Sequence, residues 1–150
     1  MKKLITIALT LIALTNVANA QQSLRSVSEL SQDPTVYTET IYVRCSALFA
    51  SVGNILKEDN FHDKDVIAKT YEAGALMFSH ATDLFQQRYD GDRSFLEDLL
   101  LETAVEIGSF YLSDMNYNLK INGDYMKNMY VQEDMGICTL IFKEVVKNYS

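Results

Sequence analysis

The sequence has only two cysteines and two histidines, and neither pair has the spacing of a familiar reactive site. Cys45 and Cys138 do not form the Cys-x-x-Cys motif of redox catalysts or the Cys-x-x-Cys-His motif of haem attachment. The chain also lacks a phosphate-binding glycine loop and a Gly-x-Ser-x-Gly nucleophile motif. None of the local motifs that predict redox, nucleotide-dependent or hydrolytic chemistry is therefore present.

Basic residues are scarce as well. The chain has 13 Lys and Arg residues against 20 Asp and Glu residues, a net charge of −7. Removing Lys2 and Lys3 with the signal peptide described below changes that net charge from −7 to −9. Because binding to phosphates requires clustered cations, this balance excludes nucleic acids and anionic lipid surfaces as partners. The negative net charge is compatible with a cationic partner. It is equally compatible with an acidic surface whose only role is to keep the protein soluble.

The first twenty residues, MKKLITIALTLIALTNVANA, have the three parts of a secretory signal peptide. They begin with two lysines, continue through an apolar run and end in Ala18-Asn19-Ala20, the small residues that a signal peptidase recognises. The apolar run is shorter than the roughly 18 residues of a membrane-spanning helix, and no later run reaches that length. We therefore expect cleavage after Ala20 and an exported product, periplasmic or extracellular, that does not span a membrane.

Proline and strand-like alternation are nearly absent too. Pro34 is the only proline, and apolar and polar residues alternate with a period of two over no more than a few positions. Apolar residues instead recur every three or four positions in four segments, which predicts four α-helices. These segments cover residues of about 34–57, 64–88, 93–119 and 124–148. Because the segments are joined by short polar turns, we expect an all-α protein with the up-down-up-down topology of a four-helix bundle.

Several local signals define the ends and contacts of these helices. Asp33 and Pro34 are predicted to start the first helix, Asp92 to cap the third, and Gly123 to end it. The small residues around Gly74 would let a neighbouring helix approach closely. Residues 21–32 are polar and weakly patterned, so we expect a mobile leader there, followed by a single helical domain at 33–150.

Cys45 and Cys138 are predicted to form a disulfide between the first and the last helix. Both lie on inward-facing apolar rows, and at about 1.5 Å of rise per residue both stand roughly 15 Å from the same end of the bundle. Matching height and matching face are what a bridge requires, and an exported protein meets an oxidising environment. Closing so long a loop would stabilise the fold by roughly 4–5 kcal/mol. The alternative is two reduced, buried thiols that act as small apolar side chains.

Two groups of side chains are candidates for metal binding. His80 would need a Glu-x-x-His pair or similar ligands from a facing helix, and none is present, so a polar position at a helix edge explains it better. Met126 and Met129 offer thioethers of the kind that bind Cu(I). Met135, the next methionine, would point to a different side of the helix, so flexible core filling is the better explanation. We therefore predict no metal and no cofactor.

The acidic residues of the third helix are the only candidates for acid–base catalysis. Paired carboxylates catalyse proton transfer only when a cleft holds them and shifts their pKa values. Glu97, Asp98, Glu102 and Glu106 instead follow the spacing of a solvated helix face. We predict no catalytic residue, and we expect His62, in a polar linker, to be a surface residue.

Aromatic and methionine side chains along the helices are the remaining feature. Buried tyrosines direct their hydroxyl groups to a partner or to water, so such side chains form a core, a pocket or a binding face. The candidate ligand or interface residues are Tyr71, Phe78, Phe85, Met115, Tyr117, Met126 and Met129.

The sequence therefore predicts an exported helical bundle that acts as a non-catalytic protein-interaction module of the cell envelope, as a monomer or homodimer. The alternative is a carrier of a small apolar or aromatic ligand, with an enclosed pocket between the helices at 64–88, 93–119 and 124–148. A metal-binding protein or an enzyme is less favoured. An exposed aromatic and methionine patch would support the interaction module.

Overall fold

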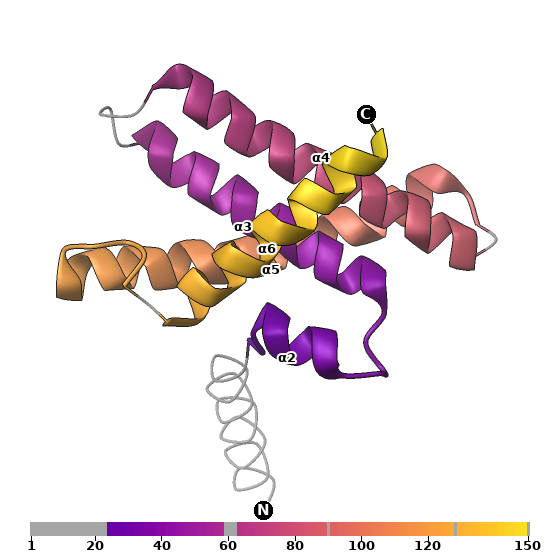
Figure 1. Cartoon of the computed structure of the whole chain (residues 1–150), viewed down its shortest axis with the longest axis horizontal. Coiled ribbons are helices and arrows are strands. Elements are labelled where there is room, and N and C mark those ends of the chain that lie inside the picture. Colours follow the sequence, from indigo (N-terminus) through magenta and orange to yellow (C-terminus); the bar gives the residue numbers. More distant parts are fainter. Residues whose placement is uncertain (1–23, 59–62, 90, 128, 150) are drawn as a thin grey trace, which may run out of the picture.

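The computed structural model describes residues 24–58, 63–89, 91–127 and 129–149. These residues form five α-helices and no strand (Figure 1). The helices are α2 (Val27–Gln32), α3 (Thr38–Glu58), α4 (Lys64–Arg88), α5 (Arg93–Asn122) and α6 (Met129–Tyr149). The predicted signal peptide with its cleavage site, and His62, lie outside the described residues. Among the described helices, none combines the length and the hydropathy needed to cross a bilayer.

The central element is α3, which contacts all four other helices. It packs most extensively against α4, which runs alongside it in the opposite direction, and then against α5 (Figure 1). The last helix, α6, crosses over α3 instead of lying along it (Figure 1). The all-helical prediction is confirmed, but the structure has one more helix than the predicted four-helix bundle, and α3 and α6 are not side by side.

The ends of α5 are as predicted. The Asp92 carboxylate accepts a hydrogen bond from the Ser94 backbone N–H at 2.8 Å, which satisfies a free donor of the first helical turn. The same carboxylate accepts a bond from the Ser94 hydroxyl and one from the Phe95 backbone N–H. The bond from the Ser94 hydroxyl, followed by the two backbone bonds, lowers the pKa of Asp92. Gly123 ends the helix with φ at +71°, a left-handed conformation that glycine adopts without strain. The helix is three residues longer than predicted, ending at Asn122.

The start of the first long helix was predicted wrongly. Residues 33–36 form a turn, and α3 begins only at Thr38. The Asp33 carboxylate accepts bonds from the Thr35 backbone N–H at 2.9 Å and from its hydroxyl at 2.6 Å. An aspartate bonded two residues ahead stabilises a turn, so Asp33 and Pro34 connect two helices instead of starting one.

The segment expected to be a patternless leader contains α2. Ser26 accepts a bond from the Glu29 backbone N–H, and the Glu29 carboxylate accepts one from Ser26, which is a capping box. Val27 is fully buried in the main core. The expectation of a leader without structure over residues 21–32 is therefore corrected for residues 27–32.

Two glycines allow helices to approach α3 closely. A Cβ atom on Gly74 of α4 would lie 3.2 Å from the Ser46 carbonyl oxygen of α3, so a larger residue would force the helices apart. On α5, a Cβ atom at Gly108 would lie 3.3 Å from the Ser51 hydroxyl oxygen. The predicted close approach at Gly74 is confirmed, and α5 has a second site of the same kind.

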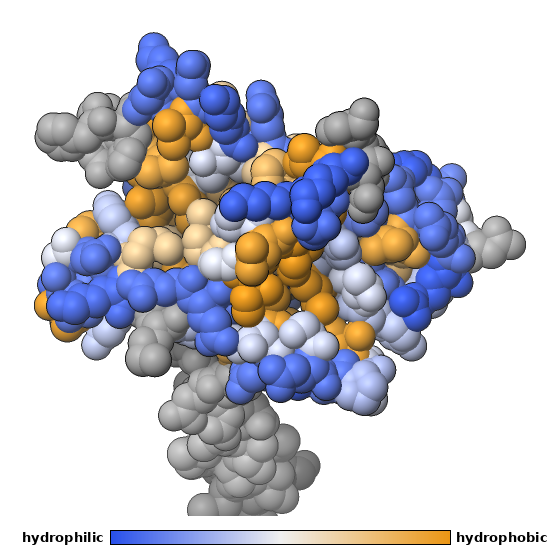
Figure 2. All heavy atoms as spheres, in the orientation of Figure 1, coloured by the Kyte–Doolittle hydropathy of each residue, from blue (hydrophilic) through white to orange (hydrophobic). Residues whose placement is uncertain are grey.

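The interior is filled by side chains. The largest fully buried ones are Tyr111, Leu48, Met77 and Met115, which come from three different helices. The rings of Phe49 and Phe142 meet edge to face with centroids 5.9 Å apart, where α3 and α6 cross. On the face shown in Figure 2, apolar side chains gather near the middle, around this crossing, and hydrophilic ones surround them.

Candidate binding groove

The predicted disulfide joins α3 to α6 at their crossing. The Cys45 and Cys138 sulfur atoms are 2.03 Å apart and both residues are fully buried. Their Cα atoms are 5.3 Å apart, within the range that a bridge spans. The disulfide is confirmed, although it joins two crossing helices instead of the antiparallel, side-by-side neighbours of the predicted bundle.

A buried ion pair lies beside this disulfide. Asp134, one turn before Cys138, is fully buried, and its Oδ2 accepts a bond from Arg44 Nη2 at 2.9 Å. Arg44 Nε lies 3.2 Å from the same oxygen. Arg44 therefore turns inward from α3 and pairs with an acid of α6.

Asp134 also connects α2 and α5 to the crossing. Its Oδ1 accepts a bond from the Val27 backbone N–H at 2.6 Å, and its Oδ2 accepts one from the Tyr111 hydroxyl. Burial raises the pKa of Tyr111 far above its ordinary value, and the negative charge of Asp134 raises it further. The Tyr111 hydroxyl therefore keeps its proton and stays a donor. One carboxylate thus links four helices, and its buried charge is paired and hydrogen-bonded. These contacts are structural and leave no free group for chemistry.

A second tyrosine–carboxylate pair strengthens the contact between α5 and α6. The Tyr130 hydroxyl donates to Asp114, and the ring of Tyr130 stacks on that of Tyr111 with centroids 6.0 Å apart. Burial, followed by the bond to Asp114, raises the pKa of Tyr130 far above its ordinary value.

On the opposite side of α3 an apolar groove of about 440 Å³ lies between α3, α4 and α5. Ala47, Ala50, Ser51 and Asn54 line it from α3, whereas Cys45 points to the other face of that helix. The remaining lining residues are Ser46 of α3; Tyr71, Gly74, Ala75 and Phe78 of α4; and Leu101, Ala104, Val105, Gly108, Ser109 and Leu112 of α5.

Large aliphatic side chains of α5 are left open to solvent at this groove. Leu101 is 52% exposed and Val105 is 61% exposed, although both belong to an apolar row of the helix. On α4 the groove is lined by Tyr71 and Phe78 and by the small residues Gly74 and Ala75, which lie between them in the sequence. An exposed apolar ridge along a groove is typical of a surface that buries another apolar element.

Several polar groups of the groove are hydrogen-bonded within the fold. The Ser51 hydroxyl lies 3.0 Å from the Gly108 carbonyl and 2.8 Å from the Ala47 carbonyl. The Tyr71 hydroxyl donates to Asn54 Oδ1 at 2.7 Å. The described lining contains no histidine, cysteine, carboxylate, lysine or arginine. The described lining is therefore mostly apolar, with serine, asparagine and tyrosine as its polar residues.

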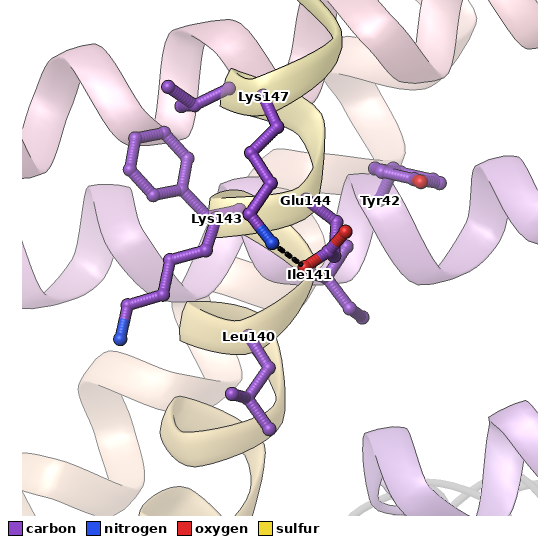
Figure 3. Close-up of a pocket in the computed structure, with 8 residues that line it drawn as sticks. Tyr42, Leu140, Ile141, Lys143, Glu144 and Lys147 are labelled. Carbon is purple, nitrogen blue, oxygen red and sulfur yellow. Dashed lines mark hydrogen bonds and ion pairs between the residues drawn. The ribbon is translucent and has the colours of Figure 1, made fainter.

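A second recess, of about 710 Å³, follows the outer side of α6. Figure 3 shows that its labelled residues come from α6, except Tyr42, which comes from α3. Lys147 and Glu144 form an ion pair on its surface. A recess beside essentially one helix encloses a ligand less completely than a groove walled by three, so the α3–α4–α5 groove is the better candidate.

The candidate interface residues from the sequence are distributed over several places. Tyr71 and Phe78 line the groove. Phe85 packs against Tyr89 at the end of α4, Met115 is buried in the core, and Met126 packs against the core from outside. Tyr117 is exposed away from the groove, and the side chain of Met129 lies outside the description.

Sequence reasoning missed the α5 side of the groove. Leu101, Val105 and Gly108 are four and three positions apart and form an apolar row, and a row of this kind is expected to be buried against a neighbour. It also missed Asp134, although the signal was present. Asp134 lies three residues after Val131 and four before Cys138, on the inward face, where an acid requires a buried partner.

Within the described residues, no three histidine, cysteine, aspartate or glutamate side chains come together as a potential metal site. The His80 ring meets the Tyr42 ring edge to face with centroids 4.7 Å apart. The acids Asp98, Glu102 and Glu106 are exposed on α5, and Glu97 pairs with Arg93.

Comparison of the chain with protein-family models, with curated proteins and with solved structures found no match.

Proposed function

We propose that this protein is an exported, non-catalytic interaction module of the cell envelope, whose α3–α4–α5 groove accepts an apolar segment of another protein. The observation that carries the proposal is the exposed apolar ridge of Leu101 and Val105 along a groove whose described lining has no histidine, cysteine, carboxylate, lysine or arginine. Laying an apolar helix face into such a groove is a common mode of peptide recognition.

Export is part of the same proposal. It rests on the signal-peptide pattern of residues 1–20 and is supported by the disulfide, since structural disulfides persist in oxidising compartments. Mass spectrometry of protein from the periplasm or medium, with and without reductant, tests it. We expect a chain that begins at Gln21 and gains the mass of two hydrogen atoms on reduction; an uncleaved chain in the cytoplasm would contradict it.

A ligand carrier is the second candidate, because a volume of about 440 Å³ lies within the range of small-molecule pockets. The form predicted from the sequence, with the ligand enclosed in the bundle core, has little support, since Met77, Tyr111 and Met115 fill that core. A carrier would therefore have to use the open groove.

Photo-crosslinking inside cells separates these functions. A photoreactive phenylalanine derivative is placed at position 105 in the groove or, as the matched control, at position 140, an exposed leucine of α6. We expect a discrete protein adduct from position 105 and not from position 140. The adduct should disappear when Ala75→Trp fills the groove and remain with Gln132→Trp, which places the same side chain at an exposed position of α6.

A small-molecule adduct from position 105 would assign the groove to a carrier instead. An adduct pattern that is the same at both positions, or unaffected by Ala75→Trp, would exclude the groove as the binding site.

A further inference from the structure

The charge around the groove is strongly one-sided. In an α-helix, residues three or four positions apart are neighbours on one face. Six acidic residues lie three or four positions from a groove-lining residue: Glu58 of α3, Glu72 of α4, and Glu97, Asp98, Glu102 and Glu106 of α5. Lys57 is the only exposed cation in the same relation, because Arg44 is buried with Asp134.

These carboxylates are available to a partner. Glu72, Asp98, Glu102 and Glu106 are exposed, and none of them forms an ion pair with another described residue. Glu72 lies on the outer edge of the α4 wall, three residues before Ala75. Glu102 lies on the outer edge of the α5 wall, three residues before Val105. Acidic side chains therefore stand on both sides of an apolar floor.

We infer that the occupant of the groove is a cationic amphipathic helix of a protein partner, with its apolar face on Leu101 and Val105 and its Lys or Arg side chains over the acidic rims. The inference rests on the proposed function and specifies its partner. Opposite charges on the flanks of an apolar contact steer association and fix its register.

The same charge disfavours the other occupants. A second copy of this chain would bring identical acidic rims together, and like charges facing each other are repulsive. An anionic lipid surface would meet the same repulsion. Solvation alone explains why acidic residues lie on the outer face of α5. It does not explain why Glu72 also lies beside the groove on α4, or why Lys57 is the one exposed cation beside the described lining.

The inference is tested with two synthetic peptides of about 18 residues, long enough to span the groove as a helix of about 27 Å. Both have leucines on one helical face; one has lysines on the flanks and the other has glutamates. Binding of each to the mature, oxidised protein is measured by fluorescence anisotropy at low and high salt. We expect the lysine peptide to bind at least about tenfold more tightly, with an affinity that falls as salt rises.

Matched variants locate the contact. The double variant Glu72→Gln, Glu102→Gln should weaken binding of the lysine peptide roughly three- to tenfold, as the loss of two exposed ion pairs allows. The control Glu133→Gln, Glu144→Gln removes the same charge from α6 and should change binding less than twofold. Leu101→Ser with Val105→Ser should reduce binding of both peptides, since it removes the apolar ridge.

The outcomes separate this inference from the proposed function. Equal binding of both peptides that is lost in the Leu101→Ser, Val105→Ser variant would overturn the cationic partner and leave the groove as a binding site. Equal effects of the two glutamine variants would show nonspecific attraction to an acidic protein and overturn it as well. Self-association that disappears in the serine variant, measured by sedimentation equilibrium, would assign the groove to a second copy.

Discussion

The α3–α6 crossing and the α3–α4–α5 groove lie on opposite faces of one helix and are held by different kinds of contact. The crossing has a disulfide, a buried ion pair, and hydrogen bonds from three helices to Asp134 on the fourth. The groove has no covalent link among its described residues; its floor is formed by the close approach of α4 and α5 to α3 at Gly74 and Gly108, and Leu101 and Val105 of α5 are exposed. Covalent and charged contacts on one face allow the other face to leave apolar surface open without loss of the fold.

The largest expected effect comes from removing the covalent link of the crossing. Replacing Cys45 and Cys138 by alanine should lower the free energy of unfolding by about 4–5 kcal/mol, because the disulfide closes a loop of 93 residues. Urea unfolding of the mature protein measures it. A loss below about 1 kcal/mol would mean that the noncovalent contacts alone determine the crossing.

The second-largest loss of stability is expected when the buried ion pair between Arg44 and Asp134 is broken. Asp134→Ala leaves the buried Arg44 without its partner, and breaking such a pair typically costs about 3–5 kcal/mol. Adding Arg44→Met should restore part of that stability, since the uncompensated charge is then gone. A single Asp134→Ala variant as stable as the native protein would contradict the role of this carboxylate as the link between four helices.

The groove floor is expected to respond more weakly. Gly74→Val should cost about 1–3 kcal/mol, because its Cβ would press on the Ser46 backbone and separate α4 from α3. Gly136 of α6 is the matched control, since it has open space around it. Gly136→Val should change the stability by no more than about 0.5 kcal/mol. Equal effects at the two glycines would show that α4 does not depend on the close approach.

The turn that leads from α2 to α3 gives the smallest effect and a pH dependence. Bonds from Thr35, followed by the pairing with Arg25, lower the pKa of Asp33 from 3.8 to about 2. The folded state therefore prefers the ionised carboxylate. The stabilisation of the fold by the ionised Asp33 carboxylate is fully present above about pH 4 and is lost as the pH falls towards 2. The difference in Tm between the native protein and Asp33→Asn should shrink over that range, and a constant difference would contradict the assignment.

The parts of the fold that the sequence predicted depend on local signals. Asp92 and Gly123 mark the ends of α5 because a cap and a left-handed residue act within a few positions. The disulfide was predictable because two inward-facing cysteines in a chain with a signal-peptide pattern have few other uses. The short α2 was missed because only one of its residues is buried, although Ser26 and Glu29 have the capping-box spacing.

The parts that the sequence did not predict depend on contacts between distant residues. The crossing of α6 over α3 is set by how side chains such as Phe49 and Phe142 interdigitate, which periodicity alone does not specify. The groove arises because Gly74 and Gly108 bring α4 and α5 close to α3 while Leu101 and Val105 stay uncovered. An apolar row looks the same in a sequence whether a neighbour covers it or not.

Hydrogen exchange of the oxidised mature protein tests the contrast between the two faces most directly. We expect the slowest exchange at residues 43–49 of α3 and 131–138 of α6, which open only with global unfolding, and faster exchange at residues 98–106 of α5 through local opening. After Asp134→Ala the protection at the crossing should fall to the level of α5. Equal protection of both regions in the native protein would contradict a locked crossing beside an open groove.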